Sequence, residues 1–281
     1  MPIDVFLAVL AAALMHAGWN AIIKVRLDRL SAVTMMSFLM GLIAALAIPF
    51  TDPPGAASWT WILTGSALHT GYKLFLVRAY AAGDLVQIYP LARGAAPLIT
   101  AVAGLFLLGE SLSMTAMTSI AVLSAGIALM AFRGGGSLSR LTGSAVFYAL
   151  ATSAFIAGYS LNDGIGARTA SSPLSYGAWL MAIDGFAMAV IALPFLPRGA
   201  IGAMRHEWRG GLAAALLSLG AYAIVLWAMT RAPIAAVAAL RESSILFALL
   251  ISATVLKERL TAWRVLAAML ILAGVAGLRL G

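Results

Sequence analysis

The chain has 281 residues, of which 63% are hydrophobic and 10% are charged, and its formal net charge is +8. Soluble domains carry about 25% charged residues, so this composition excludes water as the solvent for most of the surface. Cysteine is absent, which excludes disulfides, thiolate metal sites and cysteine nucleophiles. The lysines and arginines gather in short connections between apolar blocks, where we expect them to meet anionic lipid and not nucleic acid.

Apolar blocks long enough to cross a bilayer, about 20 residues each, fill the chain from end to end. They do not alternate in polarity as barrel strands do, so each is predicted to be a helix that satisfies its own backbone hydrogen bonds. The first block lacks a basic leader and is expected to be a retained helix. The ten predicted membrane helices are Ile3–Ile23, Ser31–Phe50, Trp59–Ala79, Leu85–Leu108, Ala116–Phe132, Thr142–Leu161, Leu174–Leu196, Gly211–Met229, Ala235–Val255 and Thr261–Leu280.

The breaks between these blocks have physical causes. Pro53 and Pro54 end the second block, because proline lacks a backbone donor and clashes with the preceding turn. Three arginines and a histidine between Pro197 and Arg209 predict an aqueous loop. A glycine-rich, charged stretch lies near the middle of the chain and predicts a linker. We therefore divide the chain into a first unit over residues 1–132, a linker over 133–141 and a second unit over 142–281.

The two halves resemble each other. A shift of 148 positions lays Arg93 on Arg241 and Leu108–Leu112 on Leu256–Leu260. Each half contains an odd number of predicted helices, five, so the second half must enter the membrane upside down. Inverted repeats of this kind are typical of secondary transporters, in which the site lies between the halves. The predicted fold class is therefore an all-α membrane protein with ten transmembrane helices in two inverted five-helix repeats.

Six short motifs occur in a fixed order along the chain: His16–Asn20, Ala79–Asp84, Tyr89–Gly94, Gly109–Leu112, Arg241–Ser244 and Lys257–Leu260. In this order and spacing they make the chain similar to the ten-helix EamA-type members of the drug/metabolite transporter superfamily. The resemblance covers the whole length and implies substrates such as amino acids, sugars, nucleotides or other metabolites, usually exported and often coupled to an ion gradient. The opening histidine motif and the chain length also resemble a subgroup associated with phosphonate utilisation.

Two arginines lie inside predicted membrane helices, where a charge costs about 2.5–3.5 kcal/mol. Arg93 is expected about 12 Å and Arg241 about 9 Å into its helix, entering from opposite faces. They would then flank a central cavity and bind an anion through their guanidinium groups. The alternative is a structural arginine that pairs with Glu242 or a carbonyl, or that reaches the headgroups; for Arg241 it is strengthened because Glu242 is adjacent.

Other polar residues share helix faces and are expected to line this cavity. His16 and Asn20 are four residues apart and so lie on one face. His69, Tyr72 and Lys73 make a similar face on the third predicted helix, Tyr159, Asn162 and Asp163 cluster near the end of the sixth, and Asp184 lies inside the seventh. Interhelical hydrogen bonds are the alternative role, with interfacial placement for Lys73 and Asp163. The substrate-binding candidates are Arg93, Arg241, His16, Trp19, Asn20, His69, Tyr72, Tyr89, Tyr159 and Asn162. The candidates for proton coupling are His16, His69, Asp184 and Glu242.

Some polar or small residues have mainly structural interpretations. Pro90 and Pro97 either free backbone carbonyls toward a substrate path or kink their helix. Glu110 is expected to cap a helix or anchor a loop, as is Glu258 in the second half. Gly126 and Gly274 are expected to let two helices approach closely. No metal-binding, phosphate-loop or nucleophile motif occurs, so no cofactor, metal or catalytic residue is predicted.

Charge in the loops predicts an orientation. The loops on the far side of the first helix carry twelve basic residues: Lys24, Arg26, Arg29, Arg78, Arg133, Arg140, Arg198, Arg205, Arg209, Lys257, Arg259 and Arg264. The near side, which includes both termini, carries only Arg168, Arg231 and Arg279. The positive-inside rule therefore predicts both termini outside, whereas the family resemblance implies termini inside.

The sequence thus predicts a multi-pass protein of the bacterial inner membrane, a monomer or homodimer whose partners are the lipid bilayer and a small-molecule substrate. It is expected to be a secondary transporter that exports a small polar or anionic metabolite, such as an amino acid or organophosphonate, with proton coupling as one mode. The alternatives are a lipid-carrier flippase, an intramembrane lipid-modifying enzyme and a non-transporting scaffold or sensor. An enzyme would need clustered carboxylates or a His/Asp pair at one membrane face, and Asp163 and Asp184 are isolated in sequence.

Overall fold

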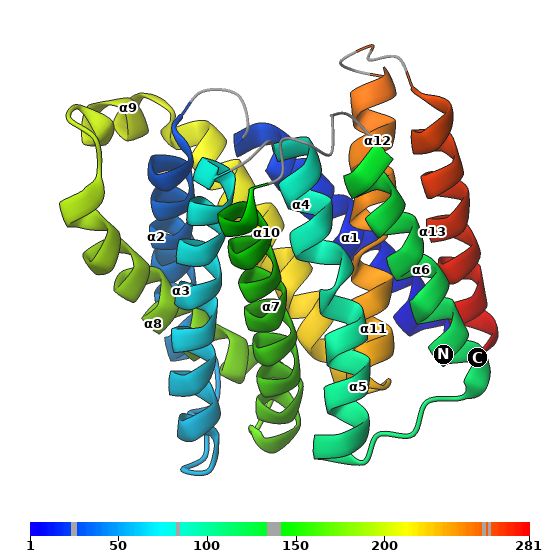
Figure 1. The fold of residues 1–281 in the computed structure, drawn as a ribbon. Helices are drawn as coiled ribbons and strands as arrows, with labels where there is room; N and C mark the ends of the chain where they lie inside the picture. Colours follow the sequence, from blue (N-terminus) through cyan, green and yellow to red (C-terminus); the bar gives the residue numbers. More distant parts are fainter. Residues whose placement is uncertain (24–26, 83–84, 134–141, 255–256, 258–259) are drawn as a thin grey trace.

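The computed structural model describes residues 1–23, 27–82, 85–133, 142–254, 257 and 260–281, and all regular structure in these ranges is helical. The first half contains α1 (Ile3–Ile23), α2 (Arg29–Ala47) with the short η1 (Ile48–Phe50), α3 (Ser58–Ala82), α4 (Leu85–Gly94), α5 (Ala96–Leu108) and α6 (Met114–Arg133). The second half contains α7 (Gly143–Thr169), α8 (Pro173–Ala192) with η3 (Leu193–Phe195), α9 (Ala200–His206), α10 (Trp208–Met229), α11 (Ile234–Arg241), α12 (Ser244–Thr254) and α13 (Ala262–Leu280). The longer helices stand side by side in one bundle, with the two chain ends close together (Figure 1).

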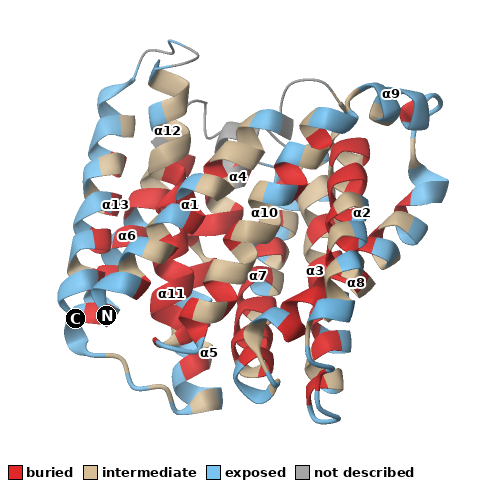
Figure 2. Ribbon diagram, turned by 180° about the vertical axis from the view of Figure 1, so that it is seen from behind, coloured by how far each residue is buried: buried red, intermediate tan, exposed pale blue. Residues whose placement is uncertain are grey.

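Within the described chain, nine segments are long and apolar enough to cross a membrane. Large apolar side chains point outward from them: Phe106 is 79% exposed and Val190 72%. Such a surface is stable only against lipid, because contiguous exposed apolar patches of this size do not occur on soluble monomers. The protein is therefore an all-α, multi-pass membrane protein. Buried residues concentrate toward the middle of the bundle (Figure 2), where α11 is buried along its whole length.

Polar side chains fix several helix starts. Asp28 begins α2 by accepting from the backbone N–H of Ser31 at 3.0 Å. Thr142 begins α7 in the same way, through the N–H of Ala145 at 3.2 Å. Each of these oxygens satisfies one of the free N–H groups that a helix leaves at its amino end. The end of α5 is set by Gly109, whose φ of 63° is readily available only to glycine.

The helix boundaries agree closely with the sequence-based ones at α1 and differ in four places. The expected unbroken helix Leu85–Leu108 is divided into α4 and α5 at Ala95, one residue before a helix that carries proline in its first turn. The expected helix Ala235–Val255 is divided after Arg241. The helix expected over Thr142–Leu161 continues to Thr169, and the expected aqueous loop after Pro197 contains α9. Most of the predicted linker, and Glu258, lie outside the described residues.

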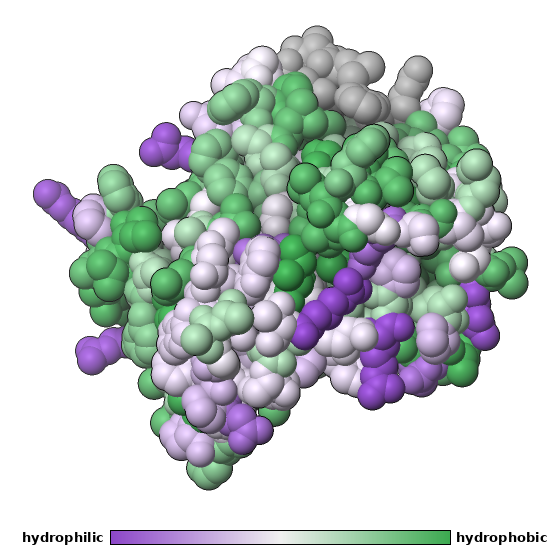
Figure 3. All heavy atoms as spheres, turned by 90° about the horizontal axis from the view of Figure 1, so that it is seen from below, coloured by the Kyte–Doolittle hydropathy of each residue, from purple (hydrophilic) through white to green (hydrophobic). Residues whose placement is uncertain are grey.

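The most extensive helix contacts join the two halves: α6 packs on α13, α3 on α7, α2 on α8 and α1 on α10. Glycine allows the closest of these approaches. A Cβ atom on Gly274 of α13 would lie 2.7 Å from the Ser119 carbonyl oxygen of α6, and one on Gly126 would lie 2.9 Å from the Ala267 carbonyl oxygen. The predicted close approach at Gly126 and Gly274 is therefore confirmed. Seen from below, the end of the bundle carries hydrophilic side chains near its centre, among hydrophobic ones (Figure 3).

Candidate functional site

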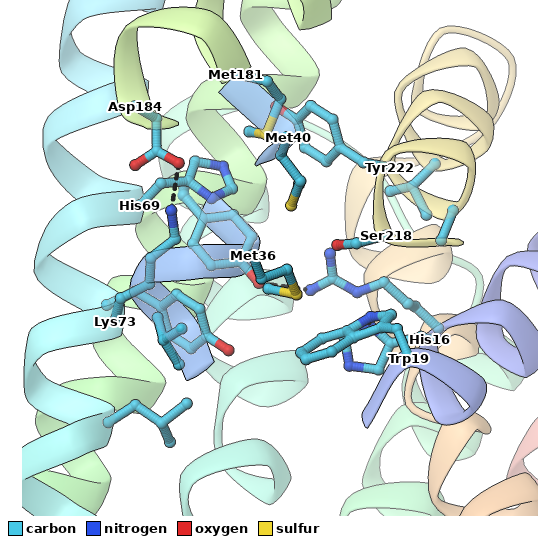
Figure 4. A pocket seen from close by; sticks show the side chains of 17 residues that line it. His16, Trp19, Met36, Met40, His69, Lys73, Met181, Asp184, Ser218 and Tyr222 are labelled. Atoms are coloured by element: carbon cyan, nitrogen blue, oxygen red, sulfur yellow. Dashed lines mark hydrogen bonds and ion pairs between the residues drawn. The ribbon is translucent and has the colours of Figure 1, made fainter. Parts of the chain in front are cut away.

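A cavity of about 110 Å³ lies between the two halves, and helices of both contribute its wall. Figure 4 shows its side chains, with His16 and Trp19 on the opposite side from Lys73 and Asp184. The predicted site residues that line it are His16, Trp19, His69, Tyr72, Tyr159, Asp184 and Arg241. Arg93, Asn20, Asn162 and Glu242 are not part of the wall, and the side chain of Tyr89 lies outside the described part of the chain.

Arg93 lies on α4, is 2% exposed and forms a two-pronged ion pair with Glu242. Its Nε donates to one carboxylate oxygen at 2.7 Å and its Nη2 to the other at 2.8 Å. This geometry satisfies both charges at once. It favours the structural alternative for Arg93 over the predicted capture of a substrate anion, and it joins the first half of the chain to the second.

Arg241, the last residue of α11, does line the cavity. Its Nη2 donates to the Tyr159 hydroxyl at 3.0 Å, and its guanidinium carbon lies 5.6 Å from the centre of the Tyr159 ring. Its Nε is buried with no hydrogen-bond partner, and no carboxylate among the described residues is within ion-pair distance of it. A buried donor without an acceptor is unusual, and here it leaves a cation with unused hydrogen-bonding capacity at a cavity.

His16 lies between two groups that can only donate hydrogen bonds. The Trp19 indole donates to its Nδ1 at 3.3 Å, and Nη1 of Arg93 lies 3.4 Å from its Nε2. A neutral imidazole has one acceptor nitrogen and a protonated one has none. The arrangement therefore fits a neutral His16. Asn20 donates to the His16 carbonyl oxygen one turn earlier at 2.9 Å and is not part of the cavity wall.

Lys73 and Asp184 form a second buried ion pair, between α3 and α8. The Thr70 hydroxyl donates to the other Asp184 oxygen at 3.0 Å. The structure buries Lys73 in the cavity wall together with His69 and Tyr72, the face predicted for α3, and not at the membrane interface that was its alternative placement.

Asp163 is the centre of a hydrogen-bonded cluster beside the cavity. One of its oxygens lies 2.7 Å from His69 Nε2 and accepts from the Tyr222 hydroxyl at 2.9 Å. The other accepts from the Tyr176 hydroxyl at 3.0 Å. Asp163 is 2% exposed, so interfacial placement does not apply to it. Sequence reasoning missed both tyrosines, because an uncharged residue in an apolar helix gives no signal of its own.

Two smaller contacts connect this cluster to its surroundings. Asn162, a predicted substrate ligand, donates to the Trp61 carbonyl oxygen at 2.8 Å and helps to hold Tyr176 at 3.1 Å. The ring of His69 stacks on Tyr159 with centres 4.2 Å apart. Tyr159 therefore contacts both Arg241 and His69, and so connects the cavity arginine to the Asp163 cluster.

Glu110 and Arg168 connect the halves at the bundle end where α5 and α7 finish. Their ion pair is 2.7 Å long, and the other Glu110 oxygen accepts from the backbone N–H of Ile234 at 2.9 Å. Arg168 also donates to the Met229 carbonyl oxygen at 2.8 Å and to the Ala232 carbonyl oxygen at 3.1 Å. The predicted capping role of Glu110 is confirmed, at the start of α11.

Comparison with known proteins gives one family and one fold. Residues 143–280 match the EamA-like transporter family. A solved structure titled only "Crystal structure of protein" superposes with a TM-score of 0.77 and 18% identity, covering 100% of this chain and 98% of the other. At that identity the likeness shows a shared fold. The comparison with curated proteins gives no match, and no finding supports the phosphonate-associated subgroup. The comparisons thus show that the second half of this membrane protein is similar to the EamA-like transporter family.

Proposed function

We propose that this chain is a secondary transporter of a small anionic metabolite, with Arg241 as the group that binds the anion. The observation that carries the proposal is Arg241 itself, which lines the cavity and has no carboxylate partner among the described residues. A guanidinium group is suited to carboxylate, phosphonate or phosphate because its donors form a planar fork. Tyr159 already uses one donor, and the unpaired Nε leaves another for a ligand.

The proposed architecture is ten crossings in two inverted repeats. Nine segments meet the criteria of length and apolarity, and α3 is the proposed tenth. Its 25 residues extend about 37 Å, enough to cross the hydrocarbon core. Its hydropathy is lowered by His69, Lys73 and Arg78, of which the first two face the cavity. The pairs α4–α5 and α11–α12 each form one interrupted crossing, as is common around transporter sites.

The helix contacts support this symmetry. Exchanging the repeats replaces α1 by α7 and α3 by α10, so the contact of α1 with α10 becomes the contact of α7 with α3. Both are among the most extensive contacts between helices. The same exchange maps α2 onto α8 and α6 onto α13, and each of these pairs is also in extensive contact. A two-fold relation between the halves accounts for all four pairings.

Alternating access requires the site to be closed on one side and open on the other. Glu110 and Arg168 join the halves at one end of the bundle. The cavity extends instead toward Val33, near the start of α2, and Leu76, near the end of α3. By the positive-inside rule this second end faces the cytoplasm, so the proposed state is inward-open, with both termini outside. The reverse state forms when the Glu110–Arg168 contact opens.

The alternative of a lipid-modifying enzyme loses support from the side-chain contacts. Asp163 is held by His69 and two tyrosines, whereas Asp184 is held by Lys73 and Thr70. The two carboxylates therefore belong to separate networks and do not form a paired acid and base. His69 and Asp163 do form a His/Asp pair, but both Asp163 oxygens accept from tyrosine hydroxyls and the His69 ring stacks on Tyr159, which favours a structural role for this pair. A proton-driven mode remains part of the proposal through His16, His69 and Asp184, which line the cavity. Flux that ignores an imposed pH gradient would remove that mode.

The test uses the purified full chain in liposomes, assayed for binding and exchange of a panel of carboxylates, phosphonates and phosphates. Arg241→Gln should weaken binding about 10- to 150-fold, the range of a lost charged hydrogen bond. Arg231→Gln is the matched control, because Arg231 is exposed and lies over the Trp227 ring. Equal binding of every anion by wild type and Arg241→Gln would refute the assignment.

A further inference from the structure

We infer that the cavity selects singly charged anions over doubly charged ones, and that Asp184 sets this selectivity by neutralising Lys73. The inference rests on the proposed function, since it takes Arg241 as the group that meets the anion. It goes beyond that function because it assigns the charge of the substrate, and assigns a specificity role to a residue that does not need to touch it.

The argument begins with the charged side chains of the cavity wall. Among the described residues these are Arg241, Lys73 and Asp184. Lys73 and Asp184 form an ion pair and cancel each other. The other buried arginine, Arg93, is outside the wall and is neutralised by Glu242. The cavity therefore presents one net positive charge, that of Arg241.

The two histidines of the wall add no uncompensated positive charge to this sum. His16 has only donors, Trp19 and Arg93, at its ring nitrogens, and so fits the neutral form. His69 lies 2.7 Å from a carboxylate oxygen of Asp163, so any positive charge on its ring is balanced by that carboxylate. Neither ring offers a second uncompensated cation to a ligand.

The remaining wall has little that can stabilise a second negative charge. It includes Met36, Met40 and Met181 together with Trp19 and Tyr222, and the Tyr222 hydroxyl already donates to Asp163. An ionised group moved from water into such surroundings is unfavourable unless a counter-charge meets it. Arg241 balances the charge of a monoanion. A dianion of the same size keeps one negative charge that no group of the wall balances.

A dianion would need Lys73 as a second counter-charge, but Lys73 is already paired with Asp184. The Lys73 ammonium group donates a hydrogen bond to one Asp184 oxygen, and the Thr70 hydroxyl donates one to the other. Asp184 is 2% exposed and Lys73 8%, so the pair is shielded from competing water. Figure 4 shows the pair at the edge of the cavity, with Lys73 directed at Asp184. Removing the carboxylate charge would leave the ammonium group facing the cavity.

The experiment compares four forms of the full chain in lipid nanodiscs. By formal charge the cavity is +1 in wild type, +2 in Asp184→Asn, 0 in Lys73→Gln and +1 again in the double variant. The probes are two matched pairs, glutaramate with glutarate and 4-carbamoylbenzoate with terephthalate. Each pair differs by one carboxylate replaced by an amide of the same shape. Binding is measured by equilibrium dialysis at pH 7 and fixed ionic strength, and Asp4→Asn provides the same charge change at an exposed site.

Wild type should bind the monoanion of each pair at least about tenfold more tightly than the dianion. Asp184→Asn should abolish or reverse this ratio, Lys73→Gln should weaken both probes, and the double variant should restore the wild-type ratio. The restoration separates charge from folding, because a merely structural role of Asp184 would leave the double variant impaired.

Three outcomes would overturn the inference, and they are distinguishable. A wild type that binds both members equally, with both lost in Arg241→Gln, contradicts the charge selectivity and leaves the anion site standing. A ratio that is the same in wild type and Asp184→Asn contradicts the role of Asp184. Binding of neither member by any form contradicts the proposed anion site itself.

Discussion

Arg93 and Arg241 occupy matching positions in the two halves of the sequence, yet they have different surroundings. Arg93 is held at both prongs by Glu242 and lies outside the cavity wall. Arg241 faces the cavity, where its guanidinium group donates to the Tyr159 hydroxyl and lies over the Tyr159 ring. Both arginines lie at the end of a short helix: Arg93 is next to last in α4 and Arg241 is last in α11. What differs is the partner of each buried charge, which supports a structural role for Arg93 and the proposed binding role for Arg241.

The two segments differ at the next position. Gly94 follows Arg93, whereas Glu242 follows Arg241. Successive residues of a helix point about 100° apart, so a carboxylate beside an arginine is directed away from it. In the structure Glu242 pairs with Arg93 of the other half. A single acidic residue in the second half thus neutralises the arginine of the first half.

The largest expected effect comes from breaking the Arg93 pair. Glu242→Gln leaves a buried guanidinium without its counter-charge, which typically costs 3–5 kcal/mol. We expect a clear fall in the melting temperature of the protein in nanodiscs. The double variant Arg93→Met with Glu242→Leu should recover most of the loss, because replacing both partners by apolar residues is often neutral. A double variant no more stable than Glu242→Gln would show that the pair does more than cancel charge.

Arg241→Gln should have the opposite effect, a large loss of ligand binding with little loss of stability. Ligand binding falls, as described above, but the free energy of unfolding should change by only about 1 kcal/mol, because one hydrogen bond and no ion pair is lost. The measurement is the melting temperature of the same preparation used for binding. A fall as large as that of Glu242→Gln would mean that Arg241 is structural after all, and the contrast between the two arginines would disappear.

Tyr159→Phe tests the binding role of Arg241 through a smaller expected loss of affinity. It removes the hydroxyl that positions Arg241 and retains the ring that stacks on His69. We expect anion affinity to fall about 2- to 12-fold, the equivalent of 0.5–1.5 kcal/mol for one hydrogen bond. The affinity of Arg241→Gln should not fall further when Tyr159→Phe is added, because the hydroxyl acts through the arginine. Additive losses would indicate that the tyrosine binds the ligand directly.

The smallest expected effect concerns the contact that closes one end. Arg168 is 37% exposed, so its ion pair with Glu110 is partly screened and contributes about 1 kcal/mol or less. Glu110→Gln should therefore shift the population toward the outward-open state only a few-fold. The chain has no cysteine, so Ala221→Cys in the cavity wall provides a clean reporter. Its labelling from the outer face should accelerate in Glu110→Gln, and an unchanged rate would exclude the contact as part of the closure.

Much of the fold was predictable because its signal is local. Apolar blocks of bilayer length give α1 with the observed bounds, and the expectation that Gly126 and Gly274 allow a close helix approach is confirmed where α6 meets α13. The interruption between α4 and α5 has a local signal in the sequence, Pro97. The interruption after Arg241 has no proline; it falls at Glu242, the residue that pairs with Arg93. A break at a residue with a distant partner cannot be seen in a local pattern.

The site was predictable only as a set of polar and charged side chains whose placement inside a membrane costs free energy. Charge identified Arg241 and Asp184 as residues that need a reason to be in the membrane, but it could not assign partners. The sequence offers Glu242 as a structural partner for either arginine and favours its neighbour Arg241, whereas in the structure Glu242 pairs with Arg93. Tyr222, whose hydroxyl contacts Asp163, carries no charge and no motif. Partner choice depends on how helices from opposite halves pack, which no single segment encodes.

The polar face of α3 has a consequence for how the chain is made. Lys73 and His69 pair with the carboxylates of Asp184 and Asp163, which lie 111 and 94 positions later in the sequence. At about 5–20 residues per second, synthesis exposes α3 on the order of 10 s before Asp184 emerges from the ribosome. During that time α3 is a poorly apolar segment with unmatched charges. Nascent chains truncated before α8 should therefore hold α3 across the membrane less efficiently than full-length chains, so that the second half of the protein completes the insertion of the first.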